Sequence, residues 1–177
     1  MRIIILLLIT MAVSACSFTP VKPGTVNIHD EFTGMTAVTV GPIQIERGIK
    51  WDLSRVTQGV DNIFVLTVVR DGATNSAGSG SKWRFLRNNR MDLIIDGERQ
   101  SLGNADHDGE ARTAGAGGVY TVERLTYQLN GEALKALSSS FDTIKGRIGS
   151  LEFNLNPEQI KALNQFADTE ITPYLIN

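Results

Sequence analysis

The strongest structural signal in this chain is a series of short segments that are β-branched or alternate between apolar and polar residues. Residues 63–69, IFVLTVV, are the most β-branched run, which favours a central strand. Apolar residues recur at every second position in residues 125–129 and 151–155, and in two shorter pairs, Val38 with Val40 and, after Pro42, Ile43 with Ile45. In an extended chain this spacing puts the apolar side chains on one face. The segments therefore predict β-strands with one buried face.

Turn signals connect the predicted strands. The pair Asp96-Gly97 lies between residues 91–95 and 98–102 and predicts a two-residue hairpin, because a type I′ turn needs positive φ at both central positions. Gly149-Ser150 joins a second strand pair, residues 144–148 and 151–155. Two longer segments, 71–82 and 103–118, are rich in glycine and polar residues and predict loops.

Two short helices are expected in the C-terminal half, at residues 131–139 and 157–167. Asn130 and Asn156 precede them and are expected to cap the first free backbone N–H groups. Pro157 suits the first helical position, and Gln159 approximates a capping box with Asn156.

These elements predict an α+β fold in a single globular domain, residues 37–177. We expect a mostly antiparallel sheet of about six to eight strands, with the two short C-terminal-half helices packed on it. The tail from Thr172 is expected to pack on the core as a last extended piece.

The N-terminus has the features of an exported protein. Arg2 supplies a positive charge, and residues 3–13 are apolar apart from Thr10. This apolar stretch is too short to span a bilayer, which takes roughly 20 residues. Small residues then lead to Cys16, as a signal peptidase requires. Residues 1–15 are therefore predicted to be a signal peptide.

The sequence Val13-Ser14-Ala15-Cys16 resembles the lipobox of bacterial lipoproteins. The resemblance covers only the signal region. It implies that Cys16 becomes the acylated first residue and that the protein is held in a membrane by its acyl chains, which include palmitate-like chains. Because Ser17 and not Asp follows the cysteine, it implies the outer membrane, with the domain facing the periplasm.

Composition narrows the expected partners and covalent links of the mature chain. The mature chain, Cys16–Asn177, has 162 residues with 16 basic and 19 acidic side chains and no basic patch, so nucleic acid is not an expected partner. Cys16 is the chain's one cysteine, so no disulfide is expected. Residues 16–36 are predicted to be the acylated cysteine and a flexible tether, since prolines and glycines interrupt them. The alternative is that part of this segment is an edge strand.

The most suggestive candidate site is the segment 104–110, NADHDGE. Oxygen-bearing side chains at Asn104, Asp106 and Asp108, followed by Gly109, match the start of an EF-hand-like calcium loop. The match then fails, because Gly115 stands where the bidentate glutamate is needed. A weak calcium site that also uses Glu110 is one interpretation, and an ordinary polar turn is the favoured one.

Other polar and aromatic residues give weaker signals. Trp51 is expected in the core rather than in a ligand platform, and Glu123 with Arg124 is expected at the surface. The favoured function is a non-catalytic binding or interaction module without a cofactor, which binds an envelope protein or a small ligand. The alternative is a calcium-binding protein or a metal-dependent hydrolase built on the 104–110 segment and His107.

Overall fold

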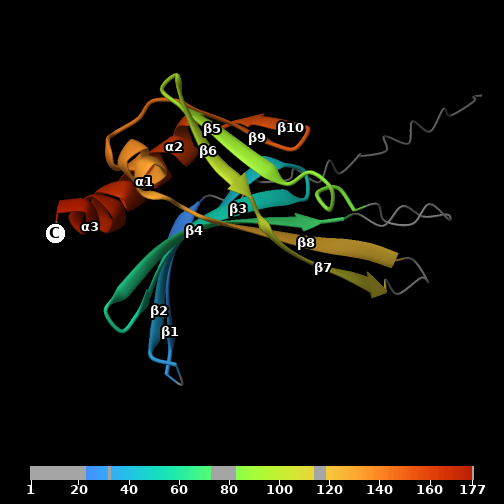
Figure 1. Ribbon diagram of the computed structural model, residues 1–177, viewed down its shortest axis with the longest axis horizontal. Helices are drawn as coiled ribbons and strands as arrows, with labels where there is room; N and C mark the ends of the chain where they lie inside the picture. Colours follow the sequence, from blue (N-terminus) through green and yellow to red (C-terminus); the bar gives the residue numbers. More distant parts are fainter. Residues whose placement is uncertain (1–22, 32, 73–82, 114–118, 177) are drawn as a thin grey trace, which may run out of the picture.

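The fold is described from a computed structural model, which covers residues 23–31, 33–72, 83–113 and 119–176 (Figure 1). Cys16, the signal segment and most of the predicted 71–82 loop lie outside these residues.

The larger sheet, sheet A, has six antiparallel strands in the order β1-β2-β3-β4-β8-β7 (Figure 1). The first four strands follow one another as a meander, whereas β8 joins β4 after a long excursion of the chain. The strands are β1 (Gly24–Asp30), β2 (Met35–Glu46), β3 (Ile49–Gln58), β4 (Asp61–Asp71), β7 (Asp106–Thr113) and β8 (Val119–Gln128).

The smaller sheet, sheet B, has four antiparallel strands in the order β10-β9-β5-β6. The β5–β6 hairpin turns at Asp96 and Gly97, where φ is 48° and 89°, as the sequence predicts. The chain passes from β6 in sheet B to β7 in sheet A through Ala105. The strands are β5 (Arg90–Ile95), β6 (Glu98–Asn104), β9 (Ile144–Ile148) and β10 (Leu151–Asn154).

The helices lie together at one end of the sheets (Figure 1). Both predicted N-caps are confirmed: Asn130 accepts from Ala133 N at 2.8 Å, and Asn156 forms a full capping box with Gln159. Helix α1 contacts β6, and α2 contacts β2. The helical segments are α1 (Gly131–Ser138), α2 (Pro157–Phe166), the π-helical turn η1 (Ala167–Ile171) and α3 (Thr172–Ile176).

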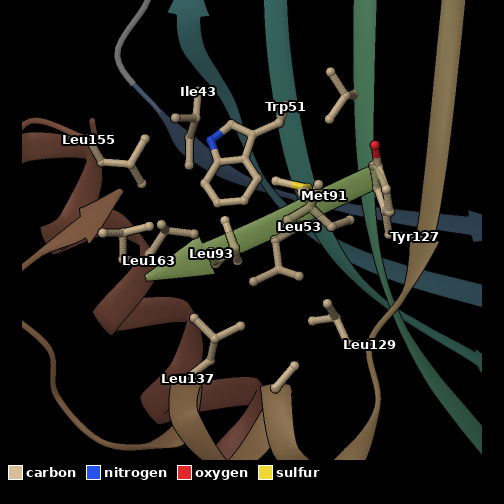
Figure 2. Close-up of a cluster of buried hydrophobic side chains, with 14 of the residues drawn as sticks. Ile43, Trp51, Leu53, Met91, Leu93, Tyr127, Leu129, Leu137, Leu155 and Leu163 are labelled. Atoms are coloured by element: carbon tan, nitrogen blue, oxygen red, sulfur yellow. The ribbon is translucent and has the colours of Figure 1, made fainter. Parts of the chain in front are cut away.

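One hydrophobic core lies between the two sheets and the helices (Figure 2). Trp51 and Leu53 of β3 meet Leu93 of β5 at its centre, and Leu137 and Leu163 close it from the helices. Trp51 is 2% exposed and its ring lies 5.9 Å from that of Phe153. The expectation that Trp51 belongs to the core is therefore confirmed.

The predicted fold class is confirmed, and three details of the prediction are wrong. The described residues form ten strands in two sheets, not six to eight strands in one. Part of the expected tether, Gly24–Asp30, is edge strand β1, which was the alternative interpretation. The tail after Thr172 is helical: α3 continues α2 through η1, and Tyr174 packs edge-on against Phe64 at 5.2 Å.

Candidate functional site

The segment proposed for calcium is a strand, not a loop. Residues Asp106–Thr113 pair one for one with β8, from Asp106 opposite Thr126 to Thr113 opposite Val119. The prediction of a loop throughout residues 103–118 is therefore wrong. The sequence of β7 lacks apolar alternation, because β7 is an edge strand whose side chains are mostly exposed.

This geometry spreads the proposed calcium ligands along the strand. Asp106, Asp108 and Glu110 occupy alternate positions, about 7 Å apart along an extended backbone. Asn104 is the last residue of β6, on the other side of Ala105. Among the described residues, no three His, Cys, Asp or Glu side chains gather into a group that could hold a metal ion. A calcium site that uses these residues stays a prediction from the sequence.

His107 lies on the opposite side of β7 and contacts a buried carboxylate. Its Nε2 is 3.4 Å from Oε1 of Glu123, and its ring lies edge-on to Trp83 at 6.2 Å. The side chain of Glu123 is 0% exposed, so the expectation of a surface charge is wrong. The sequence carried a signal for this, because Glu123 is two residues before Leu125 on the buried face of β8.

Glu123 accepts hydrogen bonds from two other segments of the chain. It accepts from the backbone N–H of Phe85 at 2.9 Å and of Arg84 at 3.0 Å, and from Arg70 Nη1 at 2.7 Å. Burial opposes ionisation, but these hydrogen bonds outweigh it, so the pKa of Glu123 lies below its ordinary value. This cluster fixes residues 84–85 on sheet A.

The outer face of sheet B has a different arrangement, which we call the basic pocket. Its floor is two cross-strand rows of side chains. In one row Lys145, Ile94 and Arg99 lie on neighbouring strands β9, β5 and β6; in the next row Arg147 and Asp92 lie side by side on β9 and β5. The cavity has a volume of about 400 Å³ and is bordered on β10 by Glu152 and Asn154.

Asp92 organises the guanidinium groups of this pocket. Its Oδ2 lies 2.9 Å from Arg99 Nη2 and 3.3 Å from Arg147 Nη2, and its Oδ1 lies 3.8 Å from Arg90 Nε. The Asp92 side chain is 8% exposed, whereas all three arginines are more than half exposed. A buried carboxylate therefore holds Arg99 and Arg147 by hydrogen bonds and lies close to Arg90, and the outer surfaces of all three arginines face solvent.

The pocket carries more positive charge than its carboxylates neutralise. Burial opposes ionisation of Asp92, but hydrogen bonds from neighbours, foremost Arg99, lower its pKa below the ordinary value, so it is charged near neutral pH. Even so, three lining cations (Arg99, Lys145 and Arg147) outnumber two lining carboxylates (Asp92 and Glu152), and Arg90 lies beside Asp92 at the margin of the pocket. This local surplus of positive charge contrasts with the net charge of −2 of the whole chain. Such a surface suits an anionic group.

Sequence reasoning missed the basic pocket because its members come from distant segments. The alternation Arg90, Asp92, Ile94 on β5 and Lys145, Arg147 on β9 was visible in the sequence. The pairing of β5 with β9, which brings the two sets together, has no local signal.

A scan against protein-family models, a search of the curated proteins and a search of the solved structures each found no match to this chain. In the part of the chain that the structure describes, none of the helices has the length and apolar character needed to cross a membrane.

Proposed function

We propose that this protein is a lipid-anchored envelope lipoprotein that acts as a non-catalytic binding module, and that its basic pocket binds an anionic group of a ligand or of an envelope protein. The observation that carries the proposal is the cluster of three arginines around buried Asp92. Carboxylate and phosphate groups share the chemistry that this cluster recognises, since both accept paired hydrogen bonds from a guanidinium.

The composition of the pocket favours binding over proton transfer. Guanidinium groups stay protonated at physiological pH and act as fixed donors. Asp92 holds Arg99 and Arg147 in place before a ligand arrives, which reduces the entropy lost on binding. Ile94, 40% exposed in the row between Lys145 and Arg99, adds an apolar contact for the body of the ligand.

The anchor part of the proposal rests on the lipobox-like sequence that ends at Cys16. Strand β1 begins at Gly24, so the eight residue steps from Cys16 reach at most about 26 Å at ~3.3 Å each. An acylated Cys16 would thus keep the domain close to the membrane surface.

Cys16→Ala is expected to abolish acylation and block processing at this position, because the modified thiol is lost. The measurement is metabolic labelling with a fatty acid analogue together with membrane fractionation. Ser17→Ala is the matched control and should leave labelling unchanged. A Cys16→Ala chain that is still matured and membrane-bound would refute the anchor.

Arg99→Gln combined with Arg147→Gln is expected to remove anion binding. In the unaltered chain, inorganic phosphate or succinate at about ten times its Kd should raise Tm by about 3–6 °C, at constant ionic strength. The double variant should show no such rise in Tm on addition of the anion, whatever its Tm is without the anion. Arg124→Gln, which removes a similarly exposed arginine on β8, is the control and should keep it. The absence of any anion-dependent shift in the unaltered chain would contradict the proposed pocket.

A further inference from the structure

Among the described residues the two sheets have four edge strands, and three of these carry features that hinder pairing with another chain. Charged side chains occupy every second position of β7 from Asp106 to Arg112. Strand β6 begins with Glu98 and Arg99 and pairs with β5 irregularly, with a register shift between Met91 and Asp92. Strand β10 has only four residues. Charges, bulges and shortness are the usual protections of a sheet edge.

Strand β1 lacks these protections. Its seven residues, GTVNIHD, contain no Lys, Arg or Pro, and its pairing with β2 is regular from Gly24 to Asp30. Among the described residues no strand pairs with its other edge. Backbone groups along such an edge are available to a further strand.

The apolar side chains of β1 are exposed and lie on the outer face of sheet A. Val26 is 54% exposed and Ile28 is 56% exposed. Across the sheet, Ile28 is in register with Ala37, Val56 and Ile63, so this row of apolar residues reaches the edge of the sheet. A strand added at β1 would extend the row.

We propose that β1 pairs antiparallel with β1 of a second copy of this chain, centred on Asn27, and joins two sheets A into one. A centre at Asn27, the middle residue, is the arrangement that pairs all seven residues. It places Val26 opposite Ile28 of the second copy on the same face, Thr25 opposite His29, and Gly24 opposite Asp30. Like carboxylates do not meet, and the two exposed apolar residues cover each other.

This inference goes beyond the proposed function and uses a different surface, since the basic pocket belongs to sheet B. One strand pair is a small interface, so we expect weak association in dilute solution. If the chain is anchored as proposed, confinement to a membrane raises the effective concentration of the second copy. The proposed register between the two β1 strands does not depend on the anchor.

The first test is disulfide crosslinking of the full chain in the membranes of the expressing cells. Asn27→Cys places a thiol next to its own symmetry mate, at a Cα separation of about 4.5–5.5 Å, within the range that a disulfide bridges. Copper-phenanthroline should then yield a covalent dimer of twice the mass of the mature chain. Ala111→Cys, an exposed position on edge strand β7, is the matched control and should yield none beyond the parent chain.

The second test changes the charges of the opposed pair in the Asn27→Cys chain. Val26→Lys with Ile28→Lys puts lysines opposite lysines and should abolish the crosslink. Val26→Lys with Ile28→Glu puts each new lysine opposite a new glutamate and should retain it, with sensitivity to salt. Both variants alter exposed side chains, so the second controls for folding.

Equal crosslinking of the two charge variants, or no dimer from Asn27→Cys at all, would overturn the pairing. A dimer that the parent chain already forms must come from Cys16, and counts against the anchor rather than against the pairing.

Discussion

Glu123→Ala is expected to lower the free energy of unfolding by about 3–5 kcal/mol, the range observed when one partner of a buried ion pair is removed. The substitution removes the carboxylate that Arg70 contacts at 2.7 Å. It also leaves the backbone N–H groups of Arg84 and Phe85 without this acceptor. The measurement is urea unfolding at pH 7, followed by circular dichroism.

Glu123→Gln removes the charge of this side chain but keeps its shape. It also allows a test by pH. The folded state lowers the pKa of Glu123, so its ionised form contributes stability above the ordinary value of 4.5. This contribution is lost as the pH falls through the lowered folded-state pKa. The parent chain should therefore lose stability in that acidic range more steeply than Glu123→Gln. Parallel profiles, or a loss below about 1 kcal/mol for Glu123→Ala, would contradict the role assigned to this carboxylate.

Trp51→Ala should cost a similar amount, about 3–5 kcal/mol, because it opens a large cavity between the two sheets. The ring is 2% exposed and packs against Phe153 as well as the side chains around it in Figure 2. The same urea titration measures the loss.

Trp51→Phe is the matched control for that cavity. It keeps an aromatic ring and removes the buried Nε1–H, which has no hydrogen-bond partner among the described residues. Removing an unsatisfied donor offsets part of the lost packing, so the cost should be much smaller than for alanine. Equal destabilisation by Trp51→Phe and Trp51→Ala would contradict cavity formation as the source of the loss.

The parts of the fold that the sequence predicted are those with local causes. The Asp96-Gly97 turn, the caps at Asn130 and Asn156, and the alternation of residues 151–155 all depend on neighbours in the chain. Each of these features has the predicted form in the structure.

The parts that could not be predicted depend on partners that are distant in sequence. Strand β7 is an exposed edge whose sequence shows no apolar alternation, and β1 is an exposed edge in which only Val26 and Ile28 alternate, so the extended form of both depends on the strand beside them. The basic pocket likewise requires β9 to lie next to β5. Glu123 is a different case, since its place on the buried face of β8 followed from the alternation through Leu125 and Tyr127.

The pairing of β4 with β8 has a consequence for how these two strands reach their register during folding. These neighbouring strands are separated in sequence by residues 72–118, which include all of β5, β6 and β7, so no tight turn sets their register. Arg70 and Glu123 are direct partners in this ladder. A slip of one residue would turn Glu123 to the outer face, away from Arg70 and from the two backbone donors. The Arg70–Glu123 ion pair thus forms only in the correct register of β4 and β8, two strands that meet after a long loop has closed.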